Sequence, residues 1–233
     1  MLLLWSGGCD STLMLFWFAR QAVANGDPAP RTLAINYEQV PCAEQQRKAR
    51  GAILKELAHR KLPVQHAELT LTKETEAAIE CEQGANADGS RTGLVQPALW
   101  LSLAQPFLQP TENLYLGYVR GDDIWHYRTQ LFDAFNAMQG VLKKTGTLQL
   151  PYEWWPKCSV ISELRAADLL KHVWYCEDRT VKKPCGSCPA CRTMSAGLHL
   201  ESTNAKEDAW RKENETVREV KGRPPKRRKS KTK

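Results

Sequence analysis

A short apolar run, a glycine-containing polar turn and a second apolar run follow one another within the first eighteen residues. Residues 1–5 are apolar, residues 6–12 read Ser-Gly-Gly-Cys-Asp-Ser-Thr, and residues 13–18 read Leu-Met-Leu-Phe-Trp-Phe. This order predicts a buried strand, a tight turn and a helix that starts in the turn. Glycine permits close backbone approach, and a helix N-terminus favours negative charge through its unpaired N–H groups. We therefore expect the turn to bind a phosphate group.

The residue spacing of this turn differs from two common nucleotide-binding loops. A Walker A loop reads Gly-x-x-x-x-Gly-Lys-Ser/Thr, and residues 6–12 contain no lysine. A dinucleotide-binding turn reads Gly-x-Gly-x-x-Gly, which the adjacent Gly7 and Gly8 do not match. The simpler alternative is a strand-to-helix turn capped by Asp or Ser. The complete string Ser-Gly-Gly-x-Asp-Ser-Thr after a strand is uncommon, which favours the phosphate site.

Strand-like and helix-like segments alternate through the rest of the chain. Apolar patterns predict strands at 32–37, 63–69, 113–119 and 148–152, and helices at 43–60, 98–108, 130–143 and 162–173, the last capped by Ser162. This alternation predicts an α/β fold with a parallel sheet covered by helices on both faces. Ligands bind beyond the carboxyl ends of such strands. Because Gly117, Asp122 and Asp123 follow the fourth predicted strand, we expect them at the same sheet edge as residues 6–12.

The charge of the chain is concentrated at its end. The net charge is +7, and residues 221–233 contain eight basic residues and no acidic one, so the remainder carries one net negative charge. The body is therefore not a basic RNA-binding surface. The basic tail is either a solubilising extension or a segment that attracts RNA or DNA non-specifically. No apolar run approaches the roughly twenty residues that span a membrane, and no signal peptide is recognisable, so we expect a cytoplasmic protein without a membrane partner.

Four cysteines lie close together near the C-terminus. Cys176, Cys185, Cys188 and Cys191 have the spacing Cys-x8-Cys-x2-Cys-x2-Cys. Four thiolates complete a tetrahedral zinc site and leave no position for water or substrate, so we expect a structural metal. An iron–sulfur cluster is the alternative that four sulfurs also support. His172 lies one expected helical turn before Cys176 and is interpreted as a surface or outer-sphere residue. The cysteines without partners at ligand spacing are Cys42, Cys81 and Cys158.

Residues 6–12 resemble the pyrophosphatase loop of ATP-dependent adenylating enzymes, a group that includes GMP synthetase, NAD synthetase and tRNA-thiolating enzymes. The resemblance implies that the loop holds the β,γ-pyrophosphate of ATP while a substrate oxygen attacks the α-phosphorus. It implies catalytic roles for Ser6, Asp10 and Ser11, with Asp10 ordering the loop or its Mg²⁺. The implied cofactor-binding residues are Ser6, Gly7, Gly8, Cys9, Asp10, Ser11 and Thr12. Cys9 occupies the variable position, and we expect it to be structural rather than nucleophilic.

The cysteine segment narrows the resemblance to one family. Residues 174–176 read Trp-Tyr-Cys and residues 183–192 read Lys-Pro-Cys-Gly-Ser-Cys-Pro-Ala-Cys-Arg, which is similar to the C-terminal zinc module of 7-cyano-7-deazaguanine synthase. That family also carries its pyrophosphatase loop at the start of the chain. In the middle, Leu-Ser-Leu-Ala at residues 101–104 and Asp122 occur in the family's order. The likeness spans about residues 2–198.

Two segments depart from the family's pattern near the expected substrate pocket. Its Pro-Gly-Arg-Asn is replaced by Leu-Val-Gln-Pro at residues 94–97, and its Tyr-Pro-Asp-Cys by Trp-His-Tyr-Arg at residues 125–128. A divergent member that stops at an amide, or that adenylates another substrate, therefore stays open. The residues expected in the substrate pocket, which could equally be ordinary loop residues, are Arg91, Asp122, Asp123, His126 and Arg128.

The resemblance also implies a fold, an activity and a set of partners. The fold is Rossmann-like, of the adenine nucleotide alpha hydrolase type, and the activity is that of a carbon–nitrogen ligase of queuosine biosynthesis. The ligase converts 7-carboxy-7-deazaguanine and ammonia into 7-cyano-7-deazaguanine, uses ATP, Mg²⁺ and structural Zn²⁺, and forms a homodimer.

We expect an ATP-binding domain at 1–174, a zinc module packed on it at 175–198, and a helical or disordered basic tail at 199–233. Two alternatives in function stay open: a tRNA-modifying enzyme with the same loop, and a non-catalytic module that binds nucleotide and zinc.

Overall fold

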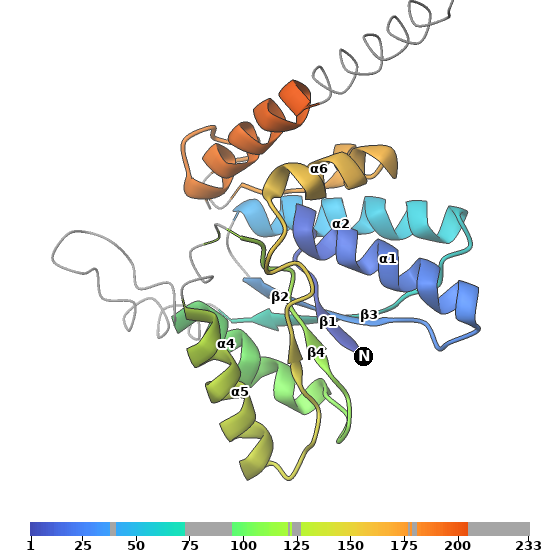
Figure 1. The fold of residues 1–233 in the computed structure, drawn as a ribbon, viewed down its shortest axis with the longest axis vertical. Coiled ribbons are helices and arrows are strands. Elements are labelled where there is room, and N and C mark those ends of the chain that lie inside the picture. The colour runs from blue at the N-terminus through green and yellow to red at the C-terminus, as the bar shows by residue number, and fades with distance from the viewer. Residues whose placement is uncertain are drawn as a thin grey trace, which may run out of the picture.

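The strands form one parallel sheet at the centre of the molecule (Figure 1). The computed structural model describes residues 1–37, 41–72, 95–120, 122, 127–176, 178 and 181–204. The strands are β1 (Leu2–Leu4), β2 (Arg31–Tyr37), β3 (Gln65–Leu71), β4 (Leu114–Tyr115) and β5 (Leu148–Gln149). Their order is β3-β2-β1-β4-β5, and every neighbouring pair is parallel.

Helices cover both faces of this sheet (Figure 1). One layer contains α1 (Cys9–Asn25), α2 (Pro41–His59) and α6 (Lys157–Ala166), and the other contains α4 (Val95–Ala104) and α5 (Arg128–Val141). Short 3₁₀ helices follow at η1 (Gln105–Phe107) and η3 (Leu170–His172), and the described chain ends in a helix over 189–204. The predicted α/β fold with two helical layers is therefore confirmed.

Strand β1 is apolar on both sides because each of its faces meets a different helical layer. Leu3 and Trp5 pack with residues of α1, α2 and α6, whereas Leu2 and Leu4 pack with residues of α4 and α5. Side chains alternate along a strand, so a strand buried on both faces needs a continuous apolar run. Residues 2–5 of this chain supply that run.

Most predicted boundaries hold within two residues, but β4 and β5 end earlier than predicted, and both bounds of the last predicted helix are wrong. The helix expected at 162–173 begins at Lys157 after Pro156, so Ser162 lies inside α6 and is not its cap. It ends at Ala166, because Asp168 adopts a positive φ of 54° that interrupts the helix. Helix α4 also ends earlier than predicted, at Ala104, and the chain continues as η1 around Pro106.

The order of the strands reverses between β1 and β4. The chain moves from β1 to β2 and β3 on one side, and then crosses to β4 and β5 on the other side. Such a reversal separates the connections at the carboxyl ends of the two central strands, where α/β proteins bind ligands. The turn at 6–12 leaves β1 at this point. Within the described residues, no helix combines the length and the apolar character that crossing a membrane requires.

Candidate functional site

The turn at 6–12 places two hydroxyl groups beside the start of α1. Gly7 has a φ of +86°, a conformation that favours glycine, and Gly8 is the N-cap of α1. The N–H of Gly8 donates to Ser6 Oγ at 3.2 Å, and Ser6 Oγ lies 3.4 Å from Ser11 Oγ. The first N–H groups of a helix have no acceptor within the helix. This arrangement can therefore bind an anion, as the sequence predicts.

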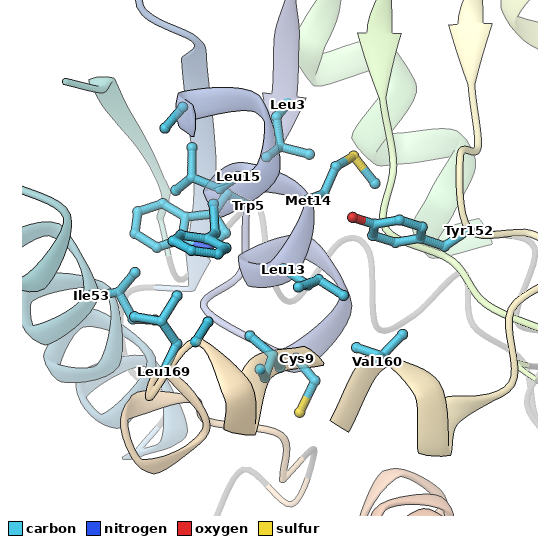
Figure 2. Packing of buried hydrophobic residues seen from close by; sticks show 14 of the residues in the cluster. Leu3, Trp5, Cys9, Leu13, Met14, Leu15, Ile53, Tyr152, Val160 and Leu169 are labelled. Atoms are coloured by element: carbon cyan, nitrogen blue, oxygen red, sulfur yellow. The ribbon is translucent and has the colours of Figure 1, made fainter. Parts of the chain in front are cut away.

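Two residues of the turn point into the protein instead. Cys9 is 2% exposed and lies among Leu13, Val160 and Leu169 (Figure 2). Burial raises the pKa of its thiol to about 12, so the thiol stays neutral, in agreement with a structural role. Thr12 is buried, and its Oγ1 accepts a hydrogen bond from Trp5 Nε1 at 3.1 Å. These two side chains fix α1 beneath the turn, and their predicted contribution to cofactor binding stays a prediction.

Gly117 lies directly against the first turn of α1. A Cβ at this position would be 2.6 Å from the backbone nitrogen of Ser11 and 2.9 Å from the carbonyl carbon of Asp10. Only a glycine therefore allows the chain leaving β4 to pass this close to the turn. The expectation that Gly117 lies at the same sheet edge as residues 6–12 is confirmed.

The structure describes two of the five predicted substrate-pocket residues. Asp122 is half-buried, and its Oδ2 accepts a hydrogen bond from the N–H of Val119 at 2.9 Å. Arg128 begins α5; its Nε lies 3.5 Å from Glu153 Oε2, and its guanidinium lies 5.2 Å from the centre of the Trp154 ring. The predicted residues outside the described part of the chain are Arg91, Asp123 and His126, and Cys81 also lies there.

Lys157 forms an ion pair with Asp10 that the sequence analysis missed. Lys157 Nζ lies 2.5 Å from Asp10 Oδ2, and both side chains are 15% exposed. Burial by itself would lower the pKa of Lys157, but the charge and hydrogen bond of Asp10, together with the nearby Cys9 and Asp122, raise this pKa above its usual value. The other oxygen, Asp10 Oδ1, is buried without a hydrogen-bond partner among the described residues. An unpaired buried carboxylate oxygen beside an anion site fits a bound Mg²⁺.

Arg50 is buried beside the turn and donates a hydrogen bond to it. The sequence did not predict this contact. Arg50 is 1% exposed, and its guanidinium donates to the carbonyl of Ser6 at 3.2 Å, to Asn36 Oδ1 at 2.6 Å and to Glu68 Oε1 at 2.9 Å. Burial raises the pKa of Glu68, but the hydrogen bonds from Arg50 and His66 outweigh it and lower this pKa overall. Arg50 thus brings a buried positive charge next to the predicted pyrophosphate site.

The sequence contains signals for both missed residues. Lys157 is the first residue of α6, where the helix dipole disfavours a positive charge, so a partner outside the helix is needed. Arg50 lies three and seven residues before Ile53 and Leu57, which are both buried, so it occupies the apolar face of α2. An arginine on such a face requires a buried acceptor. Neither signal identifies the partner.

The four predicted metal ligands converge. The Sγ atoms of Cys176, Cys185, Cys188 and Cys191 all lie within 4.8 Å of one another. Backbone N–H groups point at the sulfurs; Cys188 donates to Cys185 Sγ at 3.3 Å, and Cys191 donates to Cys188 Sγ at 3.4 Å. Hydrogen bonds from residues 187 and 188 lower the pKa of Cys185 to about 6. The donor set fits a tetrahedral metal ion.

His172 does not have the relation to this cluster that the sequence suggests. It ends η3, and residues 173–176 are not helical, so it is not one helical turn before Cys176. The early end of α6 at Ala166 accounts for this difference.

Known proteins resemble this chain in sequence or in fold. The family model described as queuosine biosynthesis protein QueC matches residues 1–201. No curated protein matches the sequence significantly. Among solved structures, the chain is similar to the U34-tRNA thiolase NcsA from Methanococcus maripaludis with its 4Fe-4S cluster, at 14% identity and a TM-score of 0.45. That match covers 88% of this chain and 66% of the thiolase chain.

Proposed function

The chain belongs to the queuosine biosynthesis protein QueC family, and on this premise we propose that it converts 7-carboxy-7-deazaguanine and ammonia into 7-cyano-7-deazaguanine at the cost of ATP. The family membership supports an ATP-using enzyme of the pyrophosphatase-loop type. The observation that carries the proposal is the turn at 6–12, where the hydroxyls of Ser6 and Ser11 lie 3.4 Å apart at the N-terminus of α1, close to the Asp10–Lys157 ion pair.

The residues of the turn have separate parts in this reaction. Ser6, Gly8 and Ser11 would bind the β,γ-pyrophosphate through hydroxyl and N–H groups. Arg50 keeps the carbonyl of Ser6 turned inward, so that this acceptor does not face the phosphates. Lys157 holds Asp10 at the edge of the same site. Donors fixed in advance stabilise the charge on leaving pyrophosphate without having to reorganise.

The chemistry requires two rounds of adenylation. A carboxylate oxygen of the substrate attacks the α-phosphorus of ATP and pyrophosphate leaves; ammonia then attacks the acyl carbon, AMP leaves with that oxygen, and an amide forms. The amide oxygen attacks a second ATP in the same way. Loss of AMP and of the two amide protons then gives the nitrile. Both carboxylate oxygens therefore leave on AMP.

Two metal ions fit residues of this chain. Asp10 Oδ1 would hold Mg²⁺, which neutralises phosphate charge when bound. Cys176, Cys185, Cys188 and Cys191 would hold Zn²⁺, which fixes their segment of the chain.

Arg128 would bind the carboxylate of the acceptor, since a guanidinium matches a carboxylate with two parallel hydrogen bonds.

The organisation into three segments also belongs to this proposal. An ATP-binding domain at 1–174 carries the chemistry, and a zinc module at 175–198 packs on it. The described helix at 189–204 continues across the proposed start of the basic tail at residue 199. A homodimer, a cytoplasmic location and non-specific attraction of this tail to nucleic acid stay predictions.

A product assay tests the reaction. The full chain is incubated with ATP, Mg²⁺, ammonium and 7-carboxy-7-deazaguanine, and we expect AMP, pyrophosphate and the nitrile by mass spectrometry. Release of ADP would overturn the mechanism, and accumulation of the amide would identify a member that stops there. AMP release that depends on added RNA would favour a tRNA-modifying enzyme.

A pair of serine variants links the assay to the turn. Ser11→Ala removes a hydroxyl of the anion site, and we expect AMP formation to fall about 10- to 100-fold while the fold is kept. Ser102→Ala is the matched control, because Ser102 is an exposed residue of α4 in the other helical layer. A Ser11→Ala protein with full activity would exclude this turn as the ATP site.

A further inference from the structure

The cysteine segment contacts the turn at 6–12 through its own backbone. The N–H of Trp174 donates to the carbonyl of Gly7 at 3.0 Å. The indole of the same residue donates to the carbonyl of Cys176 at 2.9 Å. Trp174 is thus bonded both to the turn and to the first metal ligand. A displacement of Cys176 is therefore transmitted to Gly7 through a single residue.

A second contact joins the turn to the helix that follows the cysteines. Cys9 Sγ lies 3.7 Å from Met194 Sδ, and both side chains are almost completely buried. Met194 comes three residues after Cys191, the last metal ligand, on the helix at 189–204. In Figure 2, Cys9 lies at the end of the buried cluster that contains Val160 of α6. Met194 therefore lies on the same helix as the last metal ligand and contacts the turn at 6–12.

A third contact connects this helix to Lys157. Figure 1 shows the C-terminal helix beside α6. A Cβ on Gly197 would lie 2.6 Å from Ile161 Cδ1 and 3.2 Å from Lys157 Cγ. Lys157 in turn pairs with Asp10. The helix thus also rests on the residue that holds the carboxylate of the anion site.

We propose that Trp174 and Met194 are positioning residues that couple the four-cysteine site to the turn at 6–12, so that metal binding at the cysteines tightens pyrophosphate binding at the turn. The identity of the anion rests on the proposed function. The contacts reach Gly7, Cys9 and Asp10, and each lies in the turn or in the first residues of α1.

The physical reason is that the residues between the cysteines bury little apolar surface that could stabilise the segment without metal. Cys185 and Cys188 are only half-buried, and residues 182–184 and 186–187 are exposed. A segment of this kind obtains most of its folding free energy from its metal. Without metal, the positions of Trp174 and Met194 are no longer fixed. The turn is then less ordered, and it loses conformational entropy when the anion binds, which weakens binding.

The first experiment compares the zinc-loaded full chain with the same chain after chelation. Binding of magnesium pyrophosphate is measured by titration calorimetry, and amide exchange of residues 7–9 by mass spectrometry. We expect chelation to weaken pyrophosphate binding about tenfold, within the 5- to 150-fold range typical of coupled sites, and to speed this exchange. Equal affinity and equal exchange in the two forms would overturn the proposal. A zinc-loaded chain that binds neither pyrophosphate nor ATP would instead remove the proposed function.

The second experiment keeps the metal and changes the contact. We expect Met194→Ala to retain one zinc per chain and to bind pyrophosphate several-fold more weakly, whereas Met194→Leu, which nearly conserves the volume, stays within about twofold of the wild type. Leu131→Ala is the control, because Leu131 is equally buried in the other helical layer. Met194→Ala with wild-type affinity would contradict the coupling. An equal loss of affinity in Leu131→Ala would show that general destabilisation is responsible.

A third measurement uses the reciprocity of coupled equilibria. If zinc tightens pyrophosphate binding by a given factor, pyrophosphate must tighten zinc binding by the same factor. Competition between the full chain and a chelator, with and without saturating magnesium pyrophosphate, measures that factor. We expect it to match the calorimetric ratio, and an unchanged zinc affinity would overturn the proposal.

Discussion

The four-cysteine cluster and the turn at 6–12 are built in different ways. The four cysteine ligands lie within sixteen consecutive residues, and the hydrogen bonds to their sulfurs come from the same segment. The turn at 6–12 is held by Arg50 of α2, Gly117 after β4 and Lys157 of α6. The first centre is local, and the second is assembled by the whole fold.

This difference predicts an asymmetry between the two centres. Changes in the elements around the turn should disturb the turn and still leave one zinc per chain, because the reciprocal coupling lowers the zinc affinity without emptying the site. Changes in the cysteines should disturb both, because the cysteine segment contacts Gly7 and Cys9.

Loss of one metal ligand should have the largest effect. We expect Cys188→Ser to reduce bound zinc well below one per chain and to unfold residues 176–191 locally, since metal contributes on the order of 10 kcal/mol in zinc-finger peptides. Metal analysis and thermal unfolding measure the two effects together. Cys158→Ser, at a half-buried cysteine of α6 outside the cluster, should keep its zinc. One zinc per chain in Cys188→Ser would contradict the ligand set.

Removal of the ammonium group beside Asp10 should come next. Lys157→Met leaves a largely buried carboxylate without its partner, and we expect a loss of about 3 kcal/mol in the free energy of unfolding, with zinc retained. Urea unfolding measures this loss. The control is Lys171→Met, whose solvent-exposed pair with Asp168 should contribute far less to stability. Equal losses in the two variants would show that the Asp10–Lys157 pair has no special role.

A side chain at Gly117 should displace the turn without affecting the metal. The added Cβ of Gly117→Ala would lie 2.6 Å from Ser11 N, so the turn must move. We expect AMP formation to fall about 100-fold, the typical result of a displacement of about 1 Å. Gly140→Ala, where no described residue outside the adjoining helix backbone comes within 4 Å of the new Cβ, should remain active. If Gly117→Ala lost its zinc together with its activity, the predicted asymmetry between the turn and the cysteine cluster would be wrong.

The pH dependence of stability should show the smallest effect. Burial lowers the pKa of His66, and hydrogen bonds lower that of Glu68, so both groups bind protons more weakly in the folded state. Acidification should therefore weaken the fold in two steps, first below the usual histidine value near 6.5 and then below the usual glutamate value near 4.5. Urea unfolding from pH 7.5 to 5.5 measures the first step, which His66→Gln should remove. An unchanged slope in His66→Gln would assign that step to other groups.

The sequence predicted the parts of the site that depend on neighbouring residues. The apolar alternation gave the parallel sheet and its two helical layers, the turn at 6–12 was placed correctly after β1, and the four cysteines converge as predicted. The error at α6 also has a local cause. Pro156 and Asp168 mark its two ends, but the apolar residues beyond Ala166 continue the helical pattern that the prediction followed.

The groups that hold the turn are brought to it by tertiary packing. Asp10 and Lys157 are 147 residues apart in the sequence, and Cys9 and Met194 are 185 residues apart. Their contacts depend on how α1, α6 and the C-terminal helix pack on one another, and the spacing of residues in the sequence does not predict that packing. A turn and a four-cysteine cluster are short-range patterns, which a sequence by itself specifies. The groups that hold the turn meet only because the sheet and its helices bring distant segments together.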